Sequence, residues 1–214
     1  MTTKNVSLLL IIIFIVIRLT AQEMQPQAQE VAEGQIPEEL AAVQAERLQL
    51  AVSNEDYPVT PGDMYRISFT AGGSPISNEI IVESDYSVNL GILGEIDVRG
   101  MKFPELKKQV EQMISTAYPR SLPAFMMISV GTFEVPIVGE IPQTRYVTAW
   151  GLTRLGEIVD GNLGRHSSIR NVHVRSRRGT VKQYDLWKAL NRGDLTQNPY
   201  VRPGDTITVM RVER

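Results

Sequence analysis

A turn of sequence Pro-Gly-Asp occurs twice, each time directly before a predicted strand. The surrounding segments are also similar, Tyr57-Pro58-Val59-Thr60-Pro61-Gly62-Asp63 and Pro199-Tyr200-Val201-Arg202-Pro203-Gly204-Asp205. In such a turn, proline fixes the first backbone angle, glycine permits a positive φ, and aspartate accepts a local backbone hydrogen bond. The repeat predicts two small α+β units; the alternative is chance reuse of a favourable three-residue turn.

The pattern after the first turn predicts strands and one helix. Within 104–117, apolar residues spaced i, i+4, i+7, i+8 and i+11 from Leu106 form one face of a helix. They are Leu106, Val110, Met113, Ile114 and Ala117. Short runs bounded by turn residues predict the strands 64–69, 80–82, 87–90, 94–98, 124–130 and 135–138. We therefore expect a helix packed on a sheet.

The region before the second turn predicts a similar mixture. Thr153 is a suitable N-cap for a short helix that carries Leu155, Ile158 and Val159 and stops at Gly161. The segments 169–175 and 180–184 alternate around a four-residue turn and predict a hairpin. A strand at 206–210 follows the second Pro-Gly-Asp.

The N-terminus has the features of a secretory signal. The apolar run Leu8–Ile17 is too short for a transmembrane helix, which needs roughly 20 residues, but suits a signal core of about 7 to 15. We predict a signal peptide at 1–21, cleaved after Ala21, with an uncleaved interfacial anchor as the alternative. Residues 22–55 are predicted to be a linker that contains a short helix, from Pro37 through Leu50, because proline and carboxylates suit a helix start.

The sequence contains no cysteine. This excludes disulfides, thiolate metal sites and the lipid-attachment cysteine of a bacterial lipoprotein. The exported chain must therefore be stabilised by burial alone, and we expect it in the periplasm of a double-membraned bacterium.

Charge is unevenly distributed along the chain. Eight acidic residues lie between 22 and 60, with Arg47 as the single base, and eight basic residues lie between 165 and 192, with Asp185 as the single acid. The basic region could attract an anionic polysaccharide or the acidic linker of a neighbouring subunit, or it could be a solvated hairpin. The candidate contact residues are Arg165, Arg170, Arg175, Arg177, Arg178 and Lys182.

The order of these elements resembles the bacterial polysaccharide export protein family. The segments 57–69, 84–101 and the helix after them resemble the family's export N-terminal domain, here 56–131. The segment 135–142, Tyr146, the Thr153 helix, the hairpin and the final Pro-Gly-Asp strand resemble its SLBB domain, a soluble-ligand-binding β-grasp module, here 132–214.

The resemblance implies a homo-oligomeric ring, associated with the outer membrane, through which capsular polysaccharide or exopolysaccharide leaves the cell. It implies an inner-membrane polysaccharide copolymerase as partner. Larger members have a lipid-attachment cysteine, several β-grasp modules and a pore-lining C-terminal helix, none of which is found in this sequence. The expectation is therefore a soluble ring or adaptor, with a separate outer-membrane pore protein as a further partner. Asp160-Gly161-Asn162 also departs from the family's usual Ala-Gly-Gly.

Other chemistries find little support in the sequence. His166 and His173 are the only histidines, so we predict no metal site. The sequence has neither a Gly-x-Ser-x-Gly motif nor a phosphate-binding loop, so we also predict no catalytic residue and no cofactor. Glu140 and Glu157 are the residues to replace if the chain were a carbohydrate-active enzyme. An export signal argues against nucleic acid as a partner. The prediction is a non-enzymatic export component, with a soluble sugar-binding β-grasp module as the alternative.

Overall fold

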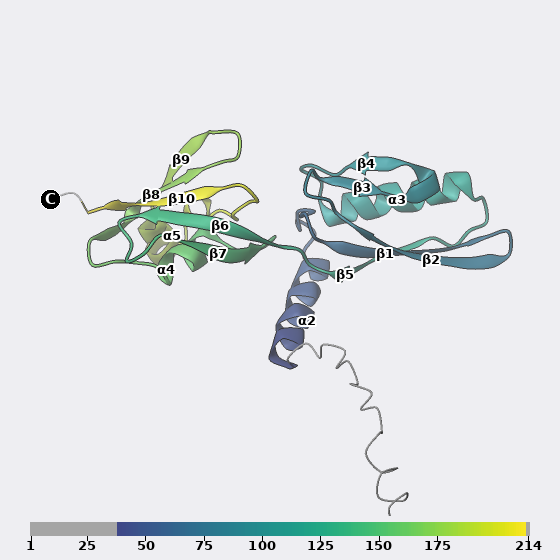
Figure 1. Cartoon of the computed structure of the whole chain (residues 1–214), viewed down its shortest axis with the longest axis horizontal. Helices are drawn as coiled ribbons and strands as arrows, with labels where there is room; N and C mark the ends of the chain where they lie inside the picture. The colour runs from purple at the N-terminus through teal and green to yellow at the C-terminus, as the bar shows by residue number, and fades with distance from the viewer. Residues whose placement is uncertain (1–37, 213–214) are drawn as a thin grey trace, which may run out of the picture. The chain divides into compact units, whose positions relative to one another are not determined.

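The computed structural model describes residues 38–212; the predicted signal peptide (1–21) and linker residues 22–37 lie outside the described residues. The elements in chain order are α2 (Glu38–Ser53), β1 (Met64–Ala71), β2 (Ser74–Ile81), β3 (Ser87–Asn89), η1 (Gly91–Leu93), β4 (Glu95–Asp97), α3 (Phe103–Ala117), β5 (Ala124–Ser129), β6 (Thr132–Gly139), β7 (Arg145–Trp150), α4 (Leu155–Asp160), β8 (Ser167–Arg175), β9 (Val181–Tyr184), α5 (Leu186–Arg192), η2 (Leu195–Gln197) and β10 (Thr206–Arg211). The described residues form a mixed α+β structure, in agreement with the predicted class (Figure 1).

Residues 38–131, the first half, contain a three-stranded antiparallel sheet of order β2-β1-β5 and the small β3-β4 hairpin. The apolar stripe predicted for α3 is confirmed at Leu106, Val110 and Ile114, which are buried. Met113 is half-buried, and Ala117 in the last turn is exposed. The three buried side chains share one cluster with the inward-facing residues of β1 and β5. Figure 1 shows α3 running beside this sheet. The cluster ends at Val130.

The first Pro-Gly-Asp turn is fixed by the buried carboxylate of Asp63, which has no exposed surface. Oδ1 accepts hydrogen bonds from the Tyr57 hydroxyl (2.9 Å) and the Gly131 N–H (2.7 Å). Oδ2 accepts from the Thr60 N–H (2.8 Å) and the Tyr65 hydroxyl (3.1 Å). Burial raises the pKa of Asp63 to about 6, and the four hydrogen bonds act in the opposite direction. This carboxylate therefore joins the turn to both ends of the first half.

Residues 132–212, the second half, contain a five-stranded sheet of order β7-β6-β10-β8-β9. Strands β6 and β10, the first and last of this sheet along the chain, are parallel neighbours, with Ile207 opposite Ile137. All other pairs are antiparallel. The inward-facing residues of β6, β8 and β10 pack against α4 in a second buried cluster, whose first member along the chain is Val135.

The predicted start of α4 is wrong by one residue. Arg154, which has extended backbone angles, is the N-cap, and its N–H donates to Glu157 Oε1 at 3.0 Å. Thr153 instead accepts a hydrogen bond from the Trp150 N–H at 3.0 Å. The threonine closes the preceding turn because its hydroxyl points back along the chain. The predicted stop at Gly161 agrees with the structure.

Several elements were not predicted in full, among them β2, β7 and α5. Strand β2 begins at Ser74, six residues before the predicted strand, and it is an edge strand that is mostly exposed. Its Pro75 and polar residues obscure the strand pattern, although proline is tolerated at a sheet edge. Strand β7 and helix α5 were not predicted at all. Among residues 38–212, no helix is both long enough and apolar enough to cross a bilayer.

Candidate functional site

The second Pro-Gly-Asp turn places an arginine at the surface. The Arg202 N–H donates to Asp205 Oδ2 at 2.8 Å, and the Asp205 N–H donates back to the Arg202 carbonyl at 3.0 Å. The guanidinium Nη1 donates to the carbonyl oxygens of Gly151 (3.0 Å) and Val201 (3.2 Å). Two fixed carbonyls therefore orient the Arg202 side chain.

Two adjoining hollows lie beside this turn, and we call them together the Arg202 cleft. The larger has a volume of about 660 Å³ and the smaller about 360 Å³, and both are lined by Ser176, Arg202 and Asp205. All described residues belong to one compact unit, and both halves contribute to the larger hollow. Its other lining residues are Pro58, Val59, Thr60, Asp85, Tyr86, Arg99, Gly100, Arg177, Arg178 and Pro203. The smaller hollow adds Val174, Thr180, Lys182, Tyr184, Pro199, Tyr200 and Val201.

Cations outnumber anions in the Arg202 cleft. Its charged residues are Arg99, Arg177, Arg178, Lys182 and Arg202 against Asp85 and Asp205. Arg99 forms an exposed ion pair with Asp97 at 3.4 Å. Within residues 38–212, no carboxylate lies within ion-pair distance of Arg177, Arg178 or Lys182. The cleft therefore presents positive charge that its own residues do not neutralise.

Partial burial also affects ionisation at the turn. Burial raises the pKa of Asp205, while the hydrogen bond from the Arg202 N–H and the Arg202 charge act against that shift. Burial lowers the pKa of Arg202. The guanidinium nevertheless stays charged at neutral pH because arginine titrates far above it.

Tyr86 borders the larger hollow in an unusual backbone conformation. Its φ is 69°, which bulky L-residues rarely adopt and which costs on the order of 1–3 kcal/mol. The backbone is held there by hydrogen bonds from the Tyr86 N–H to the Glu83 carbonyl (3.0 Å) and from the Val98 N–H to the Tyr86 carbonyl (2.9 Å). The Arg99 guanidinium lies 5.7 Å from the ring centroid. Strained residues of this kind are concentrated at functional sites.

A second tyrosine borders the smaller hollow. The Tyr200 ring centroid lies 4.2 Å from the Arg154 guanidinium and 5.6 Å from that of Arg202. These cation–π contacts hold the ring beside the turn. Together with Tyr184 and Tyr86, it gives the cleft aromatic surface in addition to its charges.

The structure divides the six predicted basic contact residues. Arg177 and Arg178 line the larger hollow and Lys182 the smaller one. Arg165 and Arg175 line neither. The six residues therefore do not all border the cleft, because residues that alternate along a strand point to opposite faces. A polysaccharide or subunit contact at any of them stays a prediction.

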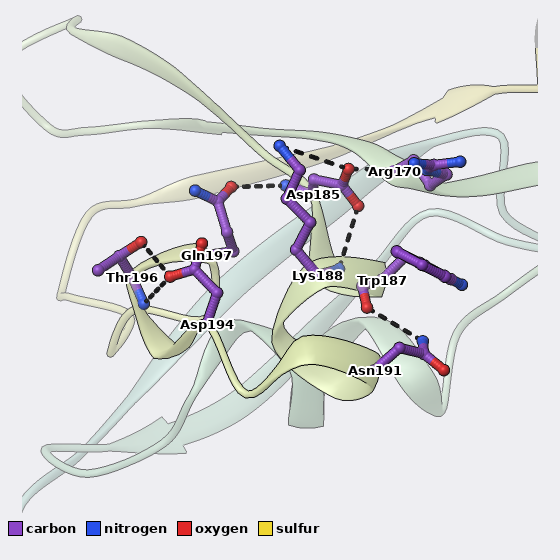
Figure 2. Close-up of polar contacts among 8 residues, drawn as sticks. All are labelled: Arg170, Asp185, Trp187, Lys188, Asn191, Asp194, Thr196 and Gln197. Carbon is purple, nitrogen blue, oxygen red and sulfur yellow. Dashed lines mark hydrogen bonds and ion pairs between the residues drawn. The ribbon is translucent and has the colours of Figure 1, made fainter.

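Arg170 takes part in a separate polar cluster around α5 (Figure 2). Its Nε lies 3.6 Å from Asp185 Oδ2, and its guanidinium lies 4.9 Å from the Trp187 ring centroid. Asp185 is the N-cap of α5 and accepts from the Lys188 N–H. Arg170 thus supports the start of a helix and does not reach the cleft.

Sequence reasoning missed several residues of the cleft, among them Arg99, Tyr86 and Arg202. Arg202 could have been found by aligning the two turns, because it is a charged residue where the first turn has Thr60. Arg99 and Tyr86 come from the other half of the chain, and no local pattern connects them to the hairpin. Within residues 38–212, no group of three or more histidine or carboxylate side chains is placed to hold a metal ion.

No protein-family model matches the chain. A search of curated proteins likewise finds no match.

Proposed function

We propose that the chain is a non-enzymatic, periplasmic component of capsular polysaccharide or exopolysaccharide export. The observation that carries this proposal is the sheet of the second half. When its strands are counted along the chain from β6 to β10, the second lies at one edge, followed by the first, fifth, third and fourth. The first and fifth strands, β6 and β10, are parallel, and a Pro-Gly-Asp turn leads into β10. That order is the one expected of a β-grasp module, which the export family combines with an N-terminal export domain.

The arrangement of the buried residues supports two domains with the boundaries 56–131 and 132–214. One cluster ends at Val130 and the other begins at Val135. The first half has the three-stranded sheet and amphipathic helix expected of the export domain. We assign the second half as the SLBB-like domain.

The state of the carboxylates supports a role in binding and not in catalysis. Glycoside hydrolysis needs two carboxyl groups that face each other across the substrate. In the cleft, Asp85 accepts the Ser87 N–H at 2.9 Å and Asp205 accepts that of Arg202. Glu157, an earlier candidate, caps α4. These groups are engaged in local backbone hydrogen bonds.

We further propose assembly into a homo-oligomeric ring that works with an inner-membrane polysaccharide copolymerase and a separate outer-membrane pore protein. Both halves expose large apolar side chains, among them Ile92, Leu122, Tyr146 and Leu190. Assembly would cover such side chains, which mark a subunit contact where they form a contiguous patch.

The test is deletion of the gene in the bacterium that carries it, with surface polysaccharide as the readout. We expect surface polymer to fall and to return when the wild-type gene is restored. Unchanged export in a strain without a compensating paralogue would refute the proposal.

A second candidate function, a soluble periplasmic sugar-binding module, is favoured by the Arg202 cleft itself. Native mass spectrometry of the purified protein separates the two. A stable monomer that retains a small sugar supports the binding module, whereas an oligomer without a retained small sugar supports the export ring.

A further inference from the structure

The two hollows of the Arg202 cleft form one elongated surface. Each hollow alone has a volume of the order that holds a small ligand, about 660 and 360 Å³. They share Ser176, Arg202 and Asp205, so the hollows meet over the Arg202 side chain. A ligand that fills both must be longer than one sugar residue.

Positive charge lies on both sides of Arg202 along this surface. Arg177 and Arg178 line only the larger hollow, and Lys182 lines only the smaller one. A ligand with a single anionic group could engage one of these positions. A ligand with repeated anionic groups could engage the cations of both hollows at once.

The arginines of the cleft suit anions with paired oxygens. A guanidinium is planar and presents paired N–H donors that match two oxygens of a carboxylate or of a phosphate group. Nη1 of Arg202 is already bound to carbonyl oxygens, which fixes the direction of the rest of the group. The side chain is therefore oriented before any ligand arrives, and less conformational entropy is lost on binding.

The uncharged surface of the cleft suits sugar rings. Pro58, Val59 and Pro203 line the larger hollow, Tyr86 borders it, and Tyr200 lines the smaller one. Apolar and aromatic side chains can cover the C–H faces of a pyranose ring while charged groups bind its substituents. A free inorganic anion would leave this surface unused.

We propose that the Arg202 cleft binds a segment of acidic polysaccharide, with uronic acid carboxylates engaging Arg202 and the cations on either side of it. That the ligand is a glycan rests on the proposed function. That it carries repeated anionic groups rests on the cleft, and carboxylates are the form that the experiment tests.

The experiment is isothermal titration calorimetry of the full chain at physiological ionic strength, with oligogalacturonate as the probe. A maltooligosaccharide of the same length has sugar rings without charge and tests the need for anionic groups. Inorganic phosphate is an anion without sugar rings and tests the need for the glycan. We expect binding of oligogalacturonate, with both controls at least about tenfold weaker, a factor that corresponds to roughly 1.4 kcal/mol.

Two variants with the same loss of charge locate the site. Arg177→Gln/Arg178→Gln removes two cations from the cleft, whereas Arg165→Gln/Arg175→Gln removes two exposed cations outside it. Arg175 follows Val174, which lines the smaller hollow, so it points to the other face of β8. We expect the first variant to weaken oligogalacturonate binding at least about tenfold and the second to leave it within about twofold, because exposed charges outside the cleft are screened.

Several outcomes would overturn the proposal. Equal loss in both variants would mean that net charge alone attracts the probe. Equal affinity for the neutral maltooligosaccharide or for phosphate would remove the acidic glycan as the ligand. A peptide of residues 22–37, which carries three glutamates, tests a neighbouring subunit as the occupant. If that peptide binds as tightly as oligogalacturonate, the cleft is a site for a second copy of this chain.

The proposal of acidic polysaccharide binding and the proposal of an export role can be refuted independently. Specific oligogalacturonate binding with unchanged surface polysaccharide after gene deletion would support the cleft and refute the export role. Loss of surface polysaccharide without oligogalacturonate binding would do the reverse.

Discussion

The two Pro-Gly-Asp turns share a backbone but have different surroundings. In each, the carboxylate Oδ2 accepts the N–H of the residue three positions earlier at 2.8 Å, and the aspartate N–H donates back to the carbonyl of that residue at 3.0 Å. Asp63 accepts three further hydrogen bonds in the first half. Asp205 accepts no other among the described residues and borders the cleft. The motif therefore fixes the turn, while distant residues decide whether its carboxylate supports the core or a surface site.

The largest expected effect comes from removing each carboxylate. Asp63→Ala leaves four donors without their acceptor, and a buried donor without a partner costs about 1–3 kcal/mol. We expect the free energy of unfolding to fall by about 4 kcal/mol or more, since the two hydroxyls can reorient but the two N–H groups cannot. Asp205→Ala removes one such bond and should cost about 1 kcal/mol. Urea unfolding of both variants measures the difference, and equal losses would contradict the comparison.

The pH dependence of stability should also distinguish the two aspartates. Asp63 has a pKa of about 6 in the folded chain against an ordinary value of 3.8. The folded state therefore binds the proton more tightly, and this contribution is present below pH 3.8 and lost as pH rises through 6. The loss should be about 3 kcal/mol.

Urea unfolding across this pH range, with Asp63→Asn and Asp205→Asn as matched variants, tests the assignment. Most of the change in unfolding free energy with pH should be seen in wild type and be lost in Asp63→Asn. The pKa of Asp205 is raised in the same direction, but this residue is less enclosed, so the slope assigned to it should be shallower. A steeper slope for Asp205 would reverse the assignment.

The next largest effect concerns the tyrosine hydroxyls that only the first turn has. Tyr65→Phe keeps the ring, whose centroid lies 4.8 Å from that of Phe125, but removes a hydrogen bond to Asp63. We expect a loss of about 1–2 kcal/mol in unfolding free energy. The pKa of Asp63 should rise further, because a donor to its charged form is gone. Tyr184→Phe, near the second turn, is the control and should leave that pKa unchanged, as measured by carboxyl NMR titration.

The smallest expected effect is on oligogalacturonate binding, which should respond to a change in the second turn and not in the first. Gly62 and Gly204 both have positive φ, +89° and +87°, so alanine at either should cost about 1–2 kcal/mol. A Cβ at Gly62 would lie 3.2 Å from the Gly131 Cα, whereas one at Gly204 would lie 2.9 Å from the Arg177 Cβ. Gly204→Ala should therefore also displace Arg177 and weaken oligogalacturonate binding several-fold, while Gly62→Ala should not. Calorimetry of both variants checks this, and equal binding would show that Arg177 does not act from this position.

The sequence predicted the fold better than the site. Helix α3 was predictable because a single apolar stripe of five turn-spaced residues identifies it. Helix α5 was not predicted because it buries only Leu186 and Ala189, whereas the shorter α4 buries three apolar residues. Its Asp185 N-cap and the left-handed Gly193 that ends it were nevertheless visible signals. Strand β2 was shortened because an exposed edge strand need not alternate.

The cleft could be predicted only in part, for a topological reason. Arg177 and Arg178 were identified from local charge density in the hairpin. Tyr86 and Arg99 reach the same hollow from more than 75 residues earlier in the chain, and single-sequence patterns carry no information on such long-range proximity. Local charge also overstated the patch, because Arg170 is committed to Asp185 and Trp187.

The position of β10 has a consequence for the order of folding. This strand lies between β6 and β8 and joins the two hairpins into one sheet. Before residues 206–211 have left the ribosome, β6-β7 and β8-β9 are isolated ribbons, which are marginally stable in water. The Arg202 cleft therefore takes shape only when β10 enters the sheet and fixes the turn that precedes it.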